Sequence, residues 1–152
     1  MRLFFLNFVI FFLFSTATIN AQEDKGASLN VRVEAVKNIK GELGIALFEN
    51  KKGYPTHIEH AYEPVWIPLK EGMSIVEHGF EGLPAGDYAV SVLHDEDGDR
   101  EMDRTKMGFP DEGVGFSNDQ KVKFSAPDYD DCKFDLAEGE DKKIVIQMDY
   151  RD

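Results

Sequence analysis

The chain has 152 residues and a formal net charge of −12, because 29 Asp and Glu outnumber 17 Lys and Arg. Such an acidic surface disfavours nucleic acid and anionic membranes as partners and raises the local concentration of cations. The length suits one domain with a hydrophobic core of its own. A single cysteine, Cys132, excludes an intrachain disulfide bond.

The first 21 residues predict a secretory signal peptide. Arg2 supplies a positive charge, residues 3–14 form an almost unbroken apolar run, and residues 15–21 are small or polar. The run is too short for a membrane span, and the small residues after it argue against a retained anchor. Cleavage is expected after Ala21, with Ala17 as the alternative, and no cysteine follows either site to carry a lipid.

These features predict a signal peptide at 1–21, a flexible leader at 22–28 and one domain at 29–152. The mature protein is expected to be exported, either periplasmic or secreted, with no transmembrane segment after cleavage. Loss of Arg2 makes its net charge one unit more negative, since no acid leaves with it.

The rest of the chain consists of short segments in which apolar and polar residues alternate, the period of half-buried β-strands. Both faces of 43–48 are apolar, which indicates a central strand, while Pro68 indicates an edge strand. No window shows sustained helical periodicity. The expected strands are 29–35, 43–48, 65–69, 74–80, 88–93, 122–124, 132–136 and 144–150.

This pattern predicts an all-β fold, a single antiparallel β-sandwich of about 7–8 strands that is immunoglobulin-like or transthyretin-like, with one long acidic loop. A closed barrel is the alternative. The turn at 83–88 fits a sandwich, because Pro84 fixes φ, Gly86 tolerates a positive φ and the Tyr88 hydroxyl can close the corner. Cys132 lies in an alternating stretch and is expected to be a buried structural thiol, with a nucleophile or an intermolecular bridge as the less favoured alternatives.

The main candidate metal site comprises four carboxylates: Asp95, Asp97, Asp99 and Asp103. They stand at the first, third, fifth and ninth places of an EF-hand-type loop, and a turn with a carboxylate at every second position can surround one cation. Arg100 occupies the sixth place instead of glycine, and Lys106 the twelfth instead of glutamate. These two residues exclude an EF-hand proper.

Two interpretations of this loop stay open. One is a solvated acidic segment in a protein that is already rich in acids. The other is a cation site, because 95–120 is long for a structureless loop in a compact domain, and a cation would offset the repulsion among its carboxylates. The hard oxygen ligands favour Ca²⁺ over transition metals. Ca²⁺ is therefore the predicted cofactor, and no cofactor is the alternative.

The second half of the loop contains glycines that allow tight reversals and apolar residues that can fold over the end of the sandwich. The favoured interpretation is a loop pinned by its own aromatic side chains, and the alternative is a ligand-binding lip beside the acidic residues. The residues concerned are Gly108, Phe109, Gly113, Val114, Gly115 and Phe116.

The histidines give weaker signals. His57 and His60 have the spacing of metal ligands on a helical turn, but prolines flank the segment, and surface histidines are favoured. His94 is followed by Asp95, a pair that an acid–base site could use, although a supporting role is favoured. The serines lack the context of a nucleophile elbow, and no phosphate loop, CxxC or HExxH motif is present.

Several stretches carry a family resemblance: GIALFENKKGY, LPAGDYAVSVLHDEDGDREMD, MGFPDEGVGFSND and KKIVIQMDY. Together they resemble the exported bacterial family called domain of unknown function 2141, over most of 29–150. That family typically shows a Leu-Pro-Gly-Tyr turn, a strand ending in His-Asp, an Asp/Asn-rich loop and a Gly-Phe-Ser-Asn segment. The resemblance implies an exported β-sandwich with no established activity and transfers no catalytic residue. Arg100 departs from the glycine that usually follows the fifth loop position.

The preferred function is therefore an exported, noncatalytic module whose Asp-rich loop is stabilised by Ca²⁺. Its partner would be an unknown envelope or extracellular protein, or a small ligand, and the sequence does not indicate an oligomeric state. The alternative is a hydrolytic enzyme that depends on a metal, or on His94 and Asp95, at the 94–103 loop. A third candidate is a structural domain that assists a neighbouring envelope protein.

Overall fold

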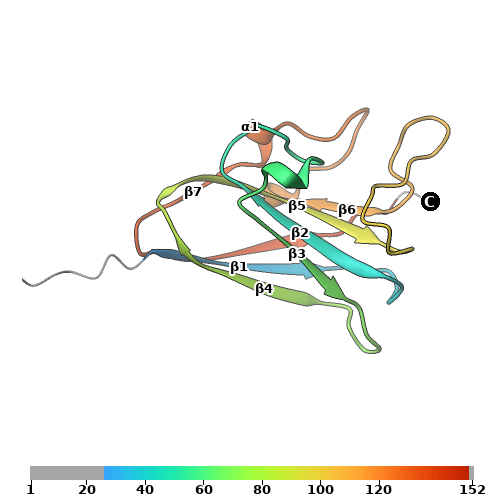
Figure 1. The fold of residues 1–152 in the computed structure, drawn as a ribbon, viewed down its shortest axis with the longest axis horizontal. Helices are drawn as coiled ribbons and strands as arrows, with labels where there is room; N and C mark the ends of the chain where they lie inside the picture. Colours follow the sequence, from blue (N-terminus) through green and yellow to red (C-terminus); the bar gives the residue numbers. More distant parts are fainter. Residues whose placement is uncertain (1–25, 151–152) are drawn as a thin grey trace, which may run out of the picture.

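The computed structural model describes residues 26–150, which form two β-sheets packed face to face (Figure 1). The all-β sandwich predicted from the alternating pattern is confirmed. The predicted signal peptide and most of the predicted leader lie outside the described residues.

The smaller sheet has three strands in the order β4-β1-β8. β1 runs antiparallel to β4 but parallel to β8, so one pair departs from the antiparallel arrangement expected of the whole sandwich. A parallel pair needs a crossover rather than a hairpin, and here the chain builds the entire larger sheet before β8 returns beside β1. The bounds are β1 Ala27–Glu34, β4 Val76–Leu83 and β8 Asp141–Gln147.

The larger sheet has the order β3-β2-β5-β6, and β7 pairs with the first residues of β5. β2 lies inside this sheet and β3 at its edge, which confirms the two placements predicted from apolar faces and from Pro68. The bounds are β2 Glu42–Phe48, β3 Glu63–Pro68, β5 Gly86–Asp95, β6 Gly113–Phe116 and β7 Phe134–Leu136.

The two faces of β2 are buried in different places. One face joins the main core between the sheets, which includes Leu29, Val31, Leu43, Ile45, Tyr88, Val90 and Ile146. The other face, with Ala46 and Phe48, packs under short helices on the outer side of the larger sheet (Figure 1). Helices η1 Ile58–His60 and α1 Tyr129–Cys132 contribute to this outer cluster, and η2 Ser117–Asp119 directly follows β6.

The predicted hydrogen-bonded turn at Tyr88 and the predicted burial of Cys132 are both confirmed. The Tyr88 hydroxyl donates a hydrogen bond to the Pro84 carbonyl oxygen at 2.8 Å and so closes the turn that enters β5. Cys132 is fully buried in the outer cluster, the apolar group that contains Ala46 and Phe48, and burial raises the pKa of its thiol. Cys132 therefore serves as a small apolar core residue.

Three local predictions are wrong. Residues 113–116 form strand β6 rather than part of a pinned loop, and Gly113 and Gly115 leave room there for the side chains of Tyr150, just after β8, and of Ile146 in β8. No strand forms at 122–124, where Phe124 is 96% exposed, since β6 and β7 already occupy that side of β5. Cys132 ends α1, and β7 begins only at Phe134.

Candidate functional site

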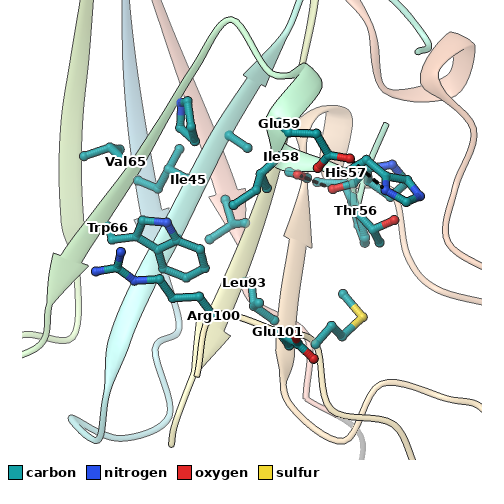
Figure 2. Close-up of a pocket in the computed structure, with 18 of the residues that line it drawn as sticks. Ile45, Thr56, His57, Ile58, Glu59, Val65, Trp66, Leu93, Arg100 and Glu101 are labelled. Atoms are coloured by element: carbon teal, nitrogen blue, oxygen red, sulfur yellow. Dashed lines mark hydrogen bonds and ion pairs between the residues drawn. The ribbon is translucent and has the colours of Figure 1, made fainter. Parts of the chain in front are cut away.

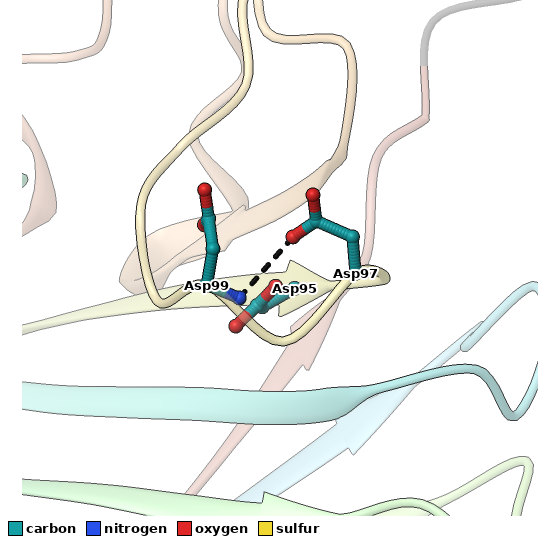
Figure 3. Close-up of side chains that lie close together, drawn as sticks. All are labelled: Asp95, Asp97 and Asp99. Atoms are coloured by element: carbon teal, nitrogen blue, oxygen red, sulfur yellow. Dashed lines mark hydrogen bonds between the residues drawn. The ribbon is translucent and has the colours of Figure 1, made fainter.

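Three of the four predicted metal ligands meet in one turn at the end of β5 (Figure 3). One oxygen from each of Asp95, Asp97 and Asp99 lies within 4.8 Å of the others. Oxygens that share one Ca²⁺ at its usual ligand distance are at most about 5 Å apart, so these three fit a single cation. Asp103 lies outside this group. Whether a cation binds stays a prediction.

The turn is shaped by its own carboxylates. The buried Asp95 accepts the backbone N–H of Gly98 at 2.7 Å and that of Arg100 at 2.8 Å, one on each oxygen. Asp97 accepts the N–H of Asp99 at 3.2 Å, the contact drawn in Figure 3. An ionised carboxylate offers about four acceptor positions, so these hydrogen bonds leave lone pairs for a cation.

Glu112 connects the acidic turn, residues 95–100, with the segment that follows it. This residue was not predicted from the sequence. Its side chain is only 7% exposed, and its oxygens accept the N–H of Glu96 at 2.8 Å and of Asp103 at 3.2 Å. Burial raises the pKa of this carboxyl, the two N–H donors oppose the rise, and the charges of Asp95 and Asp103 add to it. Glu112 precedes β6, so only recognition of that strand would have placed it beside Asp95.

His94 and Asp95 do not form an acid–base pair. Neighbouring strand residues point to opposite faces, and His94 faces the space between the sheets, where it is fully buried. Its Nε2 lies 2.9 Å from the Lys40 carbonyl oxygen and its Nδ1 2.7 Å from the Tyr150 hydroxyl. A carbonyl only accepts, so Nε2 carries a proton, and in the neutral ring Nδ1 then accepts from the Tyr150 hydroxyl. Both nitrogens are thus used structurally.

A cavity of about 490 Å³ lies beside the acidic turn, on the outer face of the larger sheet (Figure 2). Its floor comes from β2 and β5, one wall from Trp66 on β3, and the other wall from the segment around Ile58. Its rim is formed by Arg100, which closes the acidic turn, and by Glu101, Met102 and Arg104. Ligand pockets are usually about 300–1,000 Å³, so the cavity is large enough for a small molecule.

Arg100 connects the acidic turn with the cavity. Its backbone N–H is bound by Asp95, while its Nε donates to Glu42 at 2.7 Å. Its guanidinium lies 5.4 Å from the centre of the Trp66 ring system. A change in the acidic turn would therefore move a side chain of the cavity wall.

Trp66 can lie flat on the sheet because its cross-strand neighbour is Gly44. A Cβ at Gly44 would be 2.5 Å from the indole ring, a distance that no side chain tolerates. The sequence contains the signal for this contact, since the only tryptophan falls in a predicted strand. The partner strand and its register, however, were needed to see it.

The remaining candidates are less informative. His57 is exposed and lies 3.2 Å from the Glu59 carboxylate, and His60 is also exposed. Phe116 is buried and lines both this cavity and a smaller one next to it, and Phe109 lines the smaller cavity alone. The two aromatic residues of the predicted lip thus share the smaller cavity, and only Phe116 reaches the larger one.

Fold and site together define a small β-sandwich protein with an acidic turn beside an outer-face cavity. The chain belongs to the family described as "Uncharacterized protein conserved in bacteria (DUF2141)", whose sequence model matches residues 31–144. The resemblance drawn from the motifs is therefore confirmed. Neither the curated proteins nor the solved structures yielded a match. Among residues 26–150, no helix has the length and apolar character to cross a membrane.

Proposed function

We propose that this protein is an exported, noncatalytic binding module that takes a small ligand in the outer-face cavity and whose acidic turn binds Ca²⁺. The observation that carries the proposal is the position of Arg100. Its backbone closes the acidic turn, and its side chain forms part of the cavity wall. A cation bound by the turn would then hold the wall in place for the ligand.

The acidic turn supports this role through its charge. Asp97 and Asp99 are exposed, Asp95 is buried, and the buried Glu112 adds a fourth carboxylate nearby. Carboxylates this close repel one another, and a divalent cation removes the repulsion. Ca²⁺ fits the set best because all candidate ligands are hard oxygens.

The groups in and near the cavity favour binding over hydrolysis. His94 uses both ring nitrogens for structural hydrogen bonds and faces away from the cavity. The Ser91 hydroxyl, on the cavity floor, donates to the Pro55 carbonyl at 2.9 Å. A serine nucleophile needs a base in hydrogen-bond reach, and Ser91 points its proton at a backbone oxygen instead.

Ca²⁺ titration of the mature chain tests the cation part of the proposal. A ligand at a hundred times its dissociation constant stabilises the folded state by about 2.7 kcal/mol, so bound Ca²⁺ should raise the melting temperature. We expect Mg²⁺ to raise it less. Asp97→Asn removes one charge but keeps an oxygen that accepts the Asp99 N–H. This variant should bind Ca²⁺ at least tenfold more weakly by calorimetry.

Asp135→Asn is the matched control. Asp135 is an exposed aspartate on β7, which pairs with β5 at the end opposite Asp95. Its replacement removes the same charge far from the turn and should leave the titration unchanged. Equal Ca²⁺ affinities for wild type, Asp97→Asn and Asp135→Asn would show that the turn is not the cation site.

A further inference from the structure

We propose that the ligand of the outer-face cavity is a small carboxylic acid with an apolar body, whose carboxylate binds Arg100. This inference rests on the proposed binding function and adds the chemical class of the ligand. The cavity has a cationic group at one end and an apolar interior, and each of these features constrains the ligand.

The cationic end is defined by arginine. Of the three arginines in the described part of the chain, Arg32, Arg100 and Arg104, the last two line this cavity. This is notable in a protein with a net charge of −12. A planar guanidinium matches a carboxylate through two parallel hydrogen bonds, so the arginine pair favours an anionic head group.

Arg100 has donors available for such a head group. Its Nε is bound to Glu42 at 2.7 Å, and between residues 26 and 150 no hydrogen bond from its two Nη atoms is found. The hydrogen bond to Glu42 and the position of the guanidinium over the Trp66 ring restrict its orientation. A restricted orientation lowers the entropy that a ligand would lose on binding. Arg104 already donates through Nη1 to the Gly108 carbonyl and can add long-range attraction.

The acidic residues of the lining do not cancel this preference. Glu59 lies beside His57 at 3.2 Å, and Figure 2 shows this pair at the end of the cavity away from Arg100. Glu101 is exposed at the rim, where water weakens its repulsion. The head group therefore belongs at the Arg100 end, and the body extends from there along the sheet.

The interior accepts an apolar body. Leu93, Ile58 and Trp66 line it (Figure 2), and Met102 also belongs to the lining. Methionine adapts to irregular shapes, and an indole offers a flat apolar surface. A phenyl or short alkyl group would bury apolar area here, at about 25 cal/mol per Å².

The experiment uses Trp66 as the reporter, because it is the only tryptophan of the chain and lies in the cavity. The probes are 4-phenylbutyrate, its neutral amide 4-phenylbutyramide and the cation 4-phenylbutylamine, which share one apolar body. Binding to the mature chain is followed by Trp66 fluorescence and by the NMR signal of its indole N–H. We expect the carboxylate to bind at least tenfold more tightly than the amide, and the amine to bind most weakly.

Two variants localise the head group. Arg100→Gln should weaken binding of 4-phenylbutyrate about tenfold and leave binding of the amide nearly unchanged. Arg32→Gln is the matched control, because Arg32 is also an arginine paired with a glutamate but lies on β1 in the other sheet. It should change neither affinity. The comparison of the acid with the amide uses wild-type protein and does not depend on how a variant folds.

The possible failures are distinct. If the amide or the amine binds as well as the acid, or if Arg100→Gln binds the acid normally, the ligand class is wrong while a binding function stands. If none of the three probes changes either Trp66 signal at millimolar concentration, both the ligand class and the binding function assigned to this cavity are wrong.

Discussion

The hydrogen-bond chain through His94 gives the most demanding prediction. The Lys37 N–H donates to the Tyr150 hydroxyl at 3.0 Å, the hydroxyl donates to His94 Nδ1 at 2.7 Å, and Nε2 donates to the Lys40 carbonyl. The two rings pack at 86° to each other. Tyr150→Phe keeps this packing and removes only the oxygen, so it isolates the value of the hydrogen bonds.

The cost follows from burial. His94 is fully buried, and its Nδ1 would lose the donor that now pairs with it. A buried polar atom left without a partner costs about 1–3 kcal/mol, and we expect Tyr150→Phe to destabilise the fold by about 2 kcal/mol. Urea unfolding followed by Trp66 fluorescence measures this as a lower midpoint at an unchanged slope.

Tyr62→Phe provides the control, because Tyr62 is 43% exposed and loses a hydroxyl at the surface. It should shift the midpoint by little. A loss of less than about 0.5 kcal/mol in Tyr150→Phe, below the usual value of one hydrogen bond, would refute the chain of donors and reopen His94 as a group free for chemistry.

Two further predictions concern the corner and the buried acid. Tyr88→Phe should cost about 1 kcal/mol in urea unfolding, since only the hydrogen bond to Pro84 is lost; no shift would remove the corner role. Burial raises the pKa of Glu112 above its ordinary 4.5, so its contribution to stability is present below that value and is lost as the pH rises through the native pKa. Without Ca²⁺, the stability of wild type relative to Glu112→Gln should therefore fall between pH 4.5 and neutral. A rise in this relative stability over the same range would contradict the raised pKa of Glu112.

The fold was predictable where local pattern decides the outcome. Alternation placed β1, β2, β5 and β8 because one or both faces of these strands are buried. The same logic failed at 122–124, an alternating triplet, where β6 and β7 already pair with that side of β5. It also missed β6, whose glycines look like turn residues but serve to admit Tyr150 and Ile146. Strand formation at both sites depends on distant partners.

The candidate site was predictable only in its local part. Asp95, Asp97 and Asp99 stand at every second position of the sequence, and a single turn brings their side chains together. Glu112 reaches the same turn through the pairing of β6 with β5, which the sequence pattern does not reveal. The cavity depends on the register of β2 with β3, which sets Gly44 opposite Trp66.

The backbone conformation of Arg100 is one feature that this loop shares with an EF-hand despite the different residue at the sixth place. Its φ of +63° lies in the left-handed region that favours glycine, the residue expected at the sixth place. The backbone thus keeps the conformation while the side chain is an arginine. Such a residue persists only where its surroundings fix it, and here Asp95 holds the N–H while Glu42 and Trp66 hold the guanidinium. Glycine would make the turn easier to form but would remove the cationic group from the cavity, so an arginine at this position favours a role for the turn in shaping the cavity.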